Sequence, residues 1–321
     1  MTAKIFIDGE VGTTGLQIRA RLEGRPELEL ISLESDRRKD AAARREAINA
    51  ADLVILCLPD EASKEAVAFL DNPHTRMIDA STAHRTAEGW TYGFPEWRRD
   101  QARKIAEARF VSNPGCYALT SVAMLTPLVE TGLLPADWPV SINAISGYSG
   151  GGKSLIAAFE NPQDAAYTET PFRVYGLSLA HKHVPEIQHW SGLSTPPLFV
   201  PSVGNYYKGM IVQVPLALNA IPGKPSVDAV YQALAERYQD CRFVRVLGPD
   251  ETASITRLEP EDLNGSNDLL IHVFANAARG HVMLAGVLDN LGKGASGQAV
   301  QNLNLMLGLP EEAGQDKVVD R

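Results

Sequence analysis

Residues 4–15 read KIFIDGEVGTTG, and this stretch decides the fold of the first part of the chain. Residues 4–8 have the length and apolar character of a strand, and a glycine-rich turn then leads into a helix predicted over 12–22. Glycine lets a backbone approach a pyrophosphate, and a helix N-terminus offers N–H groups and a positive dipole end. The turn therefore predicts dinucleotide binding, with a tight turn that holds no ligand as the alternative. The candidate cofactor residues here are Gly9, Gly12, Thr13, Thr14 and Gly15.

The first third of the chain continues with alternating strands and helices. Strands are predicted at 28–33, 53–58, 76–79 and 110–112, and helices at 40–50 and 61–70. The run LVILCL at 53–58 is apolar throughout, as expected of a strand that is buried on both faces of a parallel sheet. This rhythm predicts an α/β domain with a doubly wound, Rossmann-like parallel sheet.

The second part of the chain has more strand-like runs than helices. Strands are predicted at 140–145, 198–203, 210–216, 243–247 and 269–275, one helix at 226–238 and a last helix at 295–307. This pattern predicts an α+β catalytic domain with a mixed sheet. We expect residues 1–115 with 291–321 to form the dinucleotide-binding domain and residues 116–290 the catalytic domain.

The segment after the second strand bears on the choice of cofactor. It reads ESDRRK over 34–39. An acid here favours NAD by binding the ribose hydroxyls, whereas bases favour NADP by binding its 2′-phosphate. The three consecutive bases favour NADP, with Ser35, Arg37 and Arg38 as candidate ligands; a solvated charged loop is the alternative.

Three widely spaced cysteines give no disulfide framework and no zinc-type spacing. Cys116 lies in NPGCY, between a predicted strand and a predicted helix, and a helix N-terminus favours the thiolate and could stabilise an oxyanion. We expect Cys116 to be a nucleophile, and Cys57 and Cys241 to be small apolar side chains without a role.

Two further motifs leave alternatives open. GYSGGGKS at 147–154 matches the phosphate-binding pattern G-x-x-x-x-G-K-S, which makes a nucleotide hydrolase or kinase a rival. HKHVPE at 181–186 would place His181 and His183 on one side of an extended segment, which could suit a metal. A histidine acting as general acid or base beside a thiolate is the stronger interpretation, and we expect no metal.

Motifs from end to end resemble the N-acetyl-gamma-glutamyl-phosphate reductases, in their shorter bacterial form, within the semialdehyde dehydrogenase superfamily. The matching stretches are GEVGTTG at 9–15, LPDEASKEA at 58–66, DASTAHR at 79–85, YGFPE at 92–96, NPGCYA at 113–118, GYSGGGK at 147–153, HKHVPEI at 181–187 and DNLGKGASGQAVQN at 289–302.

The resemblance implies NADPH-dependent reduction of N-acetylglutamyl 5-phosphate to the semialdehyde and phosphate, in arginine biosynthesis. Cys116 would form a thioester, and His181 would stabilise the thiolate and protonate the hemithioacetal oxygen. Ser149 and Gly150 would line the nicotinamide pocket, and Asn290 would anchor the carboxamide. The candidate substrate residues are Ser81, Arg85, Asn113 and Lys208.

Composition sets the classes of partner. The net charge of −9 disfavours a nucleic-acid role, because an acidic surface repels phosphate backbones. No apolar stretch approaches the roughly 20 residues that cross a bilayer, and MTAKIFIDGE does not resemble a signal peptide. We expect a cytoplasmic homo-oligomer that acts on a small acyl phosphate and binds neither nucleic acid nor membrane.

Overall fold

The computed structural model describes residues 2–315, which form two compact units. Among the described residues, unit 1 comprises 2–95, 100–115 and 295–315, and unit 2 comprises 96–99 and 116–294. The division therefore places residues 96–99 and 291–294 in unit 2, where the sequence had suggested the dinucleotide-binding domain. Residues 316–321 of that predicted domain lie outside the described residues.

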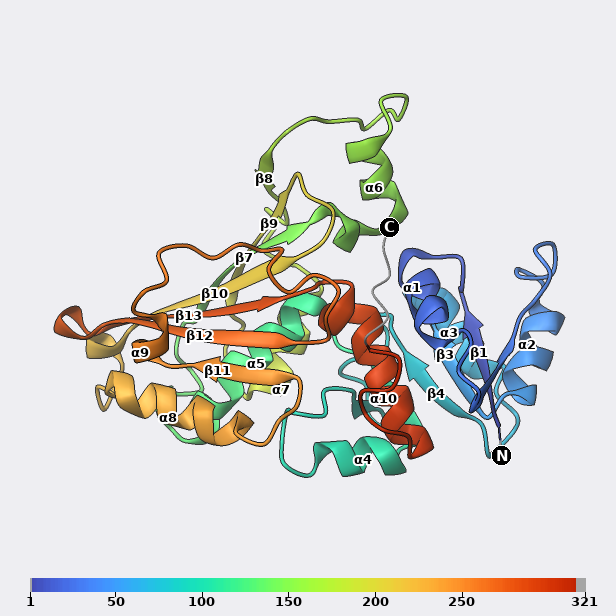
Figure 1. Ribbon diagram of the computed structural model, residues 1–321, viewed down its shortest axis with the longest axis horizontal. Coiled ribbons are helices and arrows are strands. Elements are labelled where there is room, and N and C mark those ends of the chain that lie inside the picture. The colour runs from blue at the N-terminus through green and yellow to red at the C-terminus, as the bar shows by residue number, and fades with distance from the viewer. Residues whose placement is uncertain (1, 316–321) are drawn as a thin grey trace. The chain divides into compact units, whose positions relative to one another are not determined.

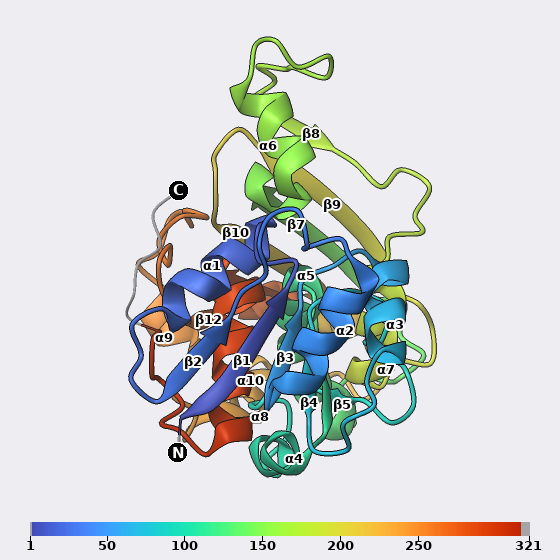
Figure 2. The same cartoon turned by 90° about the vertical axis from the view of Figure 1, so that its right-hand side faces the viewer.

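Unit 1 is built on a six-stranded sheet with the order β2-β1-β3-β4-β6-β5, in which every neighbouring pair is parallel (Figure 2). Its strands are β1 (Ala3–Asp8), β2 (Leu28–Ile31), β3 (Leu53–Leu56), β4 (Arg76–Asp79), β5 (Thr91–Tyr92) and β6 (Phe110–Ser112). Its helices are α1 (Thr13–Leu22), α2 (Ala41–Ala50), α3 (Asp60–Ala68), α4 (Gln101–Glu107) and α10 (Gly297–Leu307). The predicted doubly wound fold is confirmed.

Both faces of this sheet are buried, which explains the unbroken apolar runs of its strands. Ile5 and Ile7 belong to a core cluster with side chains of α1, α4 and α10, whereas Phe6 belongs to a second cluster with α2 and α3. Successive residues of a strand point to opposite faces, so each face needs its own apolar set. Helices therefore cover the sheet on both sides.

The chain reverses its direction of travel between β1 and β3. From β1 it passes through α1 to β2 on one side, and then through α2 to β3 on the other side of β1. The carboxyl ends of β1 and β3 are thus the topological switch point, where doubly wound sheets bind ligands. The glycine turn follows β1 directly, and Cys57 follows β3.

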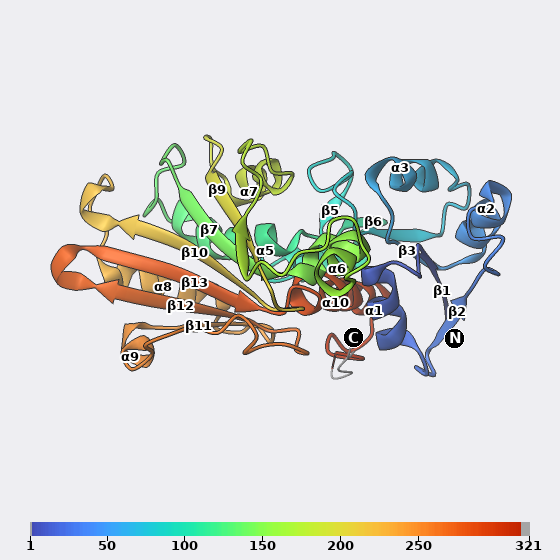
Figure 3. The same cartoon turned by 90° about the horizontal axis from the view of Figure 1, so that it is seen from above.

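Unit 2 is built on a seven-stranded mixed sheet with the order β11-β12-β13-β10-β7-β9-β8 (Figures 1 and 3). Its strands are β7 (Ser141–Gly147), β8 (Phe172–Val174), β9 (Leu198–Gly204), β10 (Met210–Ala217), β11 (Val244–Leu247), β12 (Leu269–Asn276) and β13 (His281–Leu288). Its helices are α5 (Cys116–Glu130), α6 (Gly152–Glu160), α7 (His183–Ser191), α8 (Val227–Tyr238) and α9 (Pro249–Thr252). The predicted α+β architecture is confirmed, with β8 and β13 as strands that the sequence pattern did not reveal.

Helix α5 is the central helix of unit 2. It packs on β10 and β13 and against α7 and α8, and its residues 117–128 are all buried. Its first residue is Cys116, which follows the Pro114-Gly115 turn after β6. Within residues 2–315, no helix combines the length and the apolar character that a membrane crossing requires.

Candidate active site

The chain requires glycine strictly at two positions of the glycine turn of unit 1 and less strictly at the third. Gly9 has a φ of +89°, and a Cβ there would lie 2.4 Å from the Cys57 carbonyl oxygen. A Cβ on Gly15 would lie 2.4 Å from the Gly9 carbonyl oxygen. At Gly12 the nearest atom to a Cβ would be 3.3 Å away, so its own fold demands less of that position. A bare backbone at the first turn of α1, which also holds Thr13 and Thr14, suits the approach of a pyrophosphate.

A pocket of about 400 Å³ lies beside this turn, at the carboxyl end of β2. Its lining comes from the glycine turn, α1 and the segment after β2: Glu10, Val11, Leu16, Arg19, Ser32, Leu33, Glu34, Ser35 and Arg38. The candidate cofactor residues Ser35 and Arg38 are therefore together in one pocket. Arg37 is not among the lining residues, and its guanidinium lies 3.8 Å from the Glu46 carboxylate on α2.

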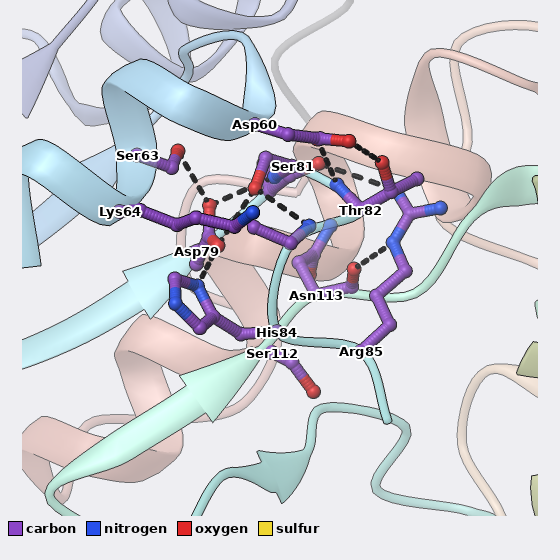
Figure 4. A network of polar contacts seen from close by, with 12 residues as sticks. Asp60, Ser63, Lys64, Asp79, Ser81, Thr82, His84, Arg85, Ser112 and Asn113 are labelled. Atoms are coloured by element: carbon purple, nitrogen blue, oxygen red, sulfur yellow. Dashed lines mark hydrogen bonds and ion pairs between the residues drawn. The ribbon is translucent and has the colours of Figure 1, made fainter. Parts of the chain in front are cut away.

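The carboxylate of Asp79 organises the loop that carries Ser81 (Figure 4). Asp79 is fully buried at the end of β4 and accepts hydrogen bonds from Ser63 Oγ at 3.1 Å and from Ser81 Oγ at 2.8 Å. His84 Nδ1 lies 2.5 Å from Asp79 Oδ2, and the His84 ring stacks on Trp90 with centroids 4.2 Å apart. Ser81 Oγ also accepts from the Ala83 N–H at 3.1 Å, so this hydroxyl holds the loop.

Arg85 and Asn113 lie in the same region of unit 1 (Figure 4). Arg85 is buried and donates to the carbonyl oxygens of Asn113 at 3.1 Å and Ala80 at 3.2 Å. The Asn113 side chain donates to the Ala295 carbonyl and accepts from Asn302 Nδ2, each at 3.0 Å. The fold thus brings three predicted substrate residues, Ser81, Arg85 and Asn113, into one network.

In unit 2, Cys116 is placed by the start of α5 and by the chain at Gly294. A Cβ on Gly294 would lie only 2.7 Å from Cys116 Cβ and 3.3 Å from the Asp289 carbonyl oxygen. Gly294 belongs to the turn Gly292–Ser296, labelled η4. Glycine at 294 therefore lets the backbone pass directly beside the cysteine.

Two phenols lie beside Cys116. Tyr117 donates to the Ser202 carbonyl at 3.2 Å, and Tyr175 donates to the Tyr117 hydroxyl oxygen at 3.2 Å. Burial is the main cause that raises the pKa of Tyr117 well above its ordinary value, with contributions from Tyr175 and Cys116. Burial likewise raises the pKa of Tyr175 to about 12, with a further contribution from Cys116. Both phenols therefore stay neutral at physiological pH.

The ring of His181 packs against the same phenols. Its centroid lies 6.1 Å from that of Tyr117 and 5.9 Å from that of Tyr175. The His183 backbone N–H donates to His181 Nδ1 at 3.1 Å, so in the neutral imidazole the proton resides on Nε2. The extended segment on which the metal alternative depends does not form, because α7 begins at His183; the helix tolerates Pro185 in its first turn.

The glycine-rich stretch at 147–154 is not shaped as a phosphate cradle. The backbone N–H groups of Gly147, Tyr148 and Ser149 donate to carbonyl oxygens of the 206–209 segment, each at 2.9 Å. A phosphate-binding loop needs such N–H groups to point at the ligand. Lys153 is exposed on α6. The N–H groups of the first three residues of the pattern are therefore not available to a phosphate.

The predicted nicotinamide residues meet around Asn290. This buried side chain accepts from the Gly209 N–H at 2.7 Å and donates to Ser149 Oγ at 3.0 Å. A Cβ on Gly150 would lie 3.5 Å from Asn290 Nδ2. An amide carries two N–H donors and two lone pairs, so these two bonds leave Asn290 the capacity to pair with a carboxamide.

Lys208 lies near the buried carboxylate of Asp289. Its Nζ is 3.8 Å from Asp289 Oδ2, and Asp289 also accepts from the N–H groups of Gly265 and Leu291 at 2.8 Å. Over residues 2–315, no group of three or more His, Cys, Asp and Glu side chains is arranged to hold a metal ion.

The sequence pattern alone did not reveal three residues at these sites. Tyr175 lies 59 positions after Cys116, and only the packing of β8 beside β9 brings it near. Arg19 lies inside α1 and enters the pocket through the pairing of β2 with β1. Gly294 belongs to the GKG run at 292–294, but the sequence does not show that this glycine lies beside Cys116. Tyr117 could have been suspected, because it is adjacent to the cysteine.

Two family models match the chain. "Semialdehyde dehydrogenase, NAD binding domain" matches residues 4–105, and "Semialdehyde dehydrogenase, dimerisation domain" matches residues 116–290. The chain is 51% identical over 313 residues to N-acetyl-gamma-glutamyl-phosphate reductase 2 of Pseudomonas putida, covering 98% of this chain and 99% of that protein. It is 54% identical over 305 residues to N-acetyl-gamma-glutamyl-phosphate reductase of Burkholderia ambifaria, covering 95% and 96%.

Solved structures resemble the fold at low identity. Aspartate semialdehyde dehydrogenase II of Vibrio cholerae, complexed with ASA, superposes with a TM-score of 0.69 at 14% identity and covers 96% of this chain and 99% of its own. Aspartate semialdehyde dehydrogenase of Candida albicans, with NADP, gives a TM-score of 0.61 at 13% identity and covers 99% and 100%. These likenesses concern the fold alone.

Proposed function

The chain belongs to the N-acetyl-gamma-glutamyl-phosphate reductases of the semialdehyde dehydrogenase family, and on that premise we propose the reaction it catalyses and the residues that carry it. It reduces N-acetylglutamyl 5-phosphate with NADPH to N-acetylglutamate 5-semialdehyde and phosphate, a step of arginine biosynthesis. The reaction passes through a thioester on Cys116. The observation that carries the assignment of residues is the contact of the His181 ring with Tyr117 and Tyr175, the two phenols beside Cys116.

The residues around the glycine turn fit a dinucleotide. The first turn of α1 would hold the pyrophosphate, and the pocket with Ser35 and Arg38 would hold the adenosine ribose and its 2′-phosphate. In unit 2, Ser149 and Gly150 would line the nicotinamide, and Asn290 would bind its carboxamide. NADPH supplies the hydride that reduces the thioester carbonyl.

Cys116 attacks the C5 carbonyl carbon of the acyl phosphate. A carbon–sulfur bond forms, the carbon–oxygen bond to phosphate breaks, and inorganic phosphate leaves with the electron pair of that bond. The start of α5 favours the thiolate that this attack needs. The neutral phenols of Tyr117 and Tyr175 keep the surroundings of the sulfur free of a competing negative charge.

His181 manages the proton of the second half-reaction. Its Nε2–H would donate to the oxygen of the hemithioacetal once the carbonyl carbon is reduced, because Nδ1 already accepts from the His183 N–H. The hemithioacetal then collapses: its hydroxyl proton returns to His181, the carbon–oxygen double bond forms again, the carbon–sulfur bond breaks with its electron pair going to sulfur, and the aldehyde leaves. His181 at the same time stabilises the thiolate that is regenerated.

The substrate anchors are part of the same proposal. Arg85 and Lys208 would meet the anionic groups of the substrate, and Ser81 and Asn113 would orient it. The proposed roles are divided between the two units, with the glycine turn and the adenosine pocket on unit 1 and the nucleophile and the nicotinamide residues on unit 2. We further propose a cytoplasmic homo-oligomer, and the match of residues 116–290 to a semialdehyde dehydrogenase dimerisation domain supports the assembly.

The reverse reaction tests this function. The purified chain is incubated with N-acetylglutamate 5-semialdehyde, phosphate and NADP, and NADPH is followed by absorbance. Phosphate-dependent NADPH formation is the expected result, and aspartate semialdehyde serves as the competing substrate. A higher kcat/KM with aspartate semialdehyde, or NADPH formation that does not require phosphate, would contradict the proposal.

A further inference from the structure

The pocket beside the glycine turn contains an arginine from α1 that no sequence motif marks. We infer that Arg19, together with Arg38, binds the 2′-phosphate of NADP, and that Arg19 is the main determinant of NADP over NAD. The inference rests on the proposed use of NADPH and deepens it. It concerns residues of unit 1 alone.

The Glu10 carboxylate pairs with the guanidinium groups of both Arg19 and Arg38. Arg19 Nη1 pairs with Glu10 Oε2, and Arg38 Nη2 lies 3.2 Å from Glu10 Oε1. The Glu10 side chain is only 10% exposed, whereas those of Arg19 and Arg38 are 33% and 39% exposed. A nearly buried acid therefore fixes two arginines whose outer surfaces still face the pocket.

Further contacts fix the two arginines from the side of β2. Arg19 Nη1 donates to Ser32 Oγ at 2.8 Å, directly after β2, and Arg38 Nε donates to the Leu33 carbonyl at 3.2 Å. Both side chains are thus oriented by the chain itself. Less conformational entropy is lost when a ligand binds to side chains that are already ordered.

The chemistry of this pocket matches a phosphate monoester. Guanidinium groups bind phosphate oxygens through paired, charge-assisted hydrogen bonds, and the hydroxyls of Ser32 and Ser35 add donors. Glu34 lines the same pocket and is the residue type that binds ribose hydroxyls in NAD sites. Glu10 pairs with both guanidiniums and is only 10% exposed, so the pocket offers a ligand two partly exposed guanidiniums and the exposed Glu34, a set that favours the phosphorylated ribose.

The place in the fold matches as well. In a doubly wound sheet the ribose of the adenosine half lies at the carboxyl end of β2, beside the glycine turn. This pocket is lined by both of those segments. Arg37, the neighbour of Arg38, does not line this pocket, and its guanidinium lies 3.8 Å from the Glu46 carboxylate.

A binding experiment on the full chain tests the inference without turnover. Isothermal titration with 2′,5′-ADP and with 5′-AMP gives the preference for the 2′-phosphate as a ratio of two dissociation constants. In Arg19→Met we expect this ratio to fall by roughly 10- to 100-fold, because one charge-assisted contact is lost. The affinity for 5′-AMP should stay within about twofold. Arg103→Met, which removes an exposed arginine of α4, is the matched control and should leave the ratio unchanged.

Three outcomes would overturn the inference. If the unaltered chain prefers 2′,5′-ADP but Arg19→Met keeps that preference while Arg37→Met loses it, the phosphate ligand is Arg37, and only this inference fails. If the unaltered chain does not prefer 2′,5′-ADP at all, the proposed use of NADPH fails with it. An equal loss of affinity for both nucleotides in Arg19→Met would mean that Arg19 only supports the fold of α1, which also contradicts the inference.

Discussion

Cys57 and Cys116 lie in similar places in the chain and in different chemical surroundings. Both follow a strand of the parallel sheet, β3 and β6, and both are half-buried. Burial, with the nearby carboxylates of Asp79 and Asp8, raises the pKa of the Cys57 thiol, so it stays protonated at neutral pH. Cys116 begins α5, beside two neutral phenols against which the His181 ring packs. The two thiols therefore differ in their surroundings: desolvation and two carboxylates keep Cys57 protonated, whereas the start of a helix favours the thiolate of Cys116.

The largest effect is expected for Cys116→Ser. A serine hydroxyl is a far weaker nucleophile than a thiolate, so kcat should fall by roughly four orders of magnitude or more. Binding of NADP, measured by titration, should be unchanged, because the substitution alters none of the residues proposed to bind the dinucleotide. Turnover within tenfold of the unaltered enzyme would show that Cys116 is not the nucleophile.

His181→Asn comes next and tests whether the ring near Cys116 handles a proton. Asparagine keeps a polar side chain of similar reach but cannot donate a proton as an acid, so we expect kcat to fall by about 100-fold. His189→Asn, on the exposed side of α7, is the matched control and should stay within about twofold. Equal kcat values for the two variants would show that His181 does not act as the acid in this reaction.

Gly294→Ala should reduce kcat less than the two preceding substitutions, because it only displaces the catalytic cysteine. The added Cβ would start 2.7 Å from Cys116 Cβ, so the cysteine or the turn η4 must shift. We expect kcat to fall by roughly tenfold, since small displacements of a nucleophile reduce the rate. The KM for NADPH should not change, and a drop in NADPH affinity without a change in kcat would contradict this account.

Cys57→Ser should have the smallest effect. A thiol that stays protonated contributes no nucleophile, so kcat should remain within about twofold, and iodoacetamide should label Cys116 much faster than Cys57. Peptide mapping after brief alkylation measures both rates. Preferential labelling of Cys57 would reverse the comparison of the two thiols.

The regular parts of the fold were predictable because local pattern and burial agree there. The run at 53–58 predicted β3, and Asp40 and Ser226 mark the starts of α2 and α8 because their side chains cap them. Strand β13 was missed because Ala285 and Gly286 interrupt its apolar run. A Cβ at Gly286 would lie 2.3 Å from Thr120 Cγ2, so the packing of α5 decides that residue rather than strand propensity.

The candidate site divides in the same way. Cys116 was predictable from NPGCY, because its surroundings are set by the adjacent turn and helix. Tyr175 and Arg19 were not, because β8 and β2 bring them into place through strand pairing with distant segments. Arg37 and Arg38 are adjacent in sequence but lie in different surroundings, a distinction that only side-chain geometry reveals.

The thioester on Cys116 is the central claim, and mass spectrometry of the intact protein tests it most directly. The enzyme is mixed with N-acetylglutamyl 5-phosphate without NADPH and quenched in acid. The mass of the intact protein is measured, and peptide mapping then locates the modified residue. The account predicts a single N-acetylglutamyl group on the peptide that contains Cys116, absent in Cys116→Ser and lost when NADPH is added before the quench. An active enzyme that carries no such group, or carries it on Cys57, would contradict the account.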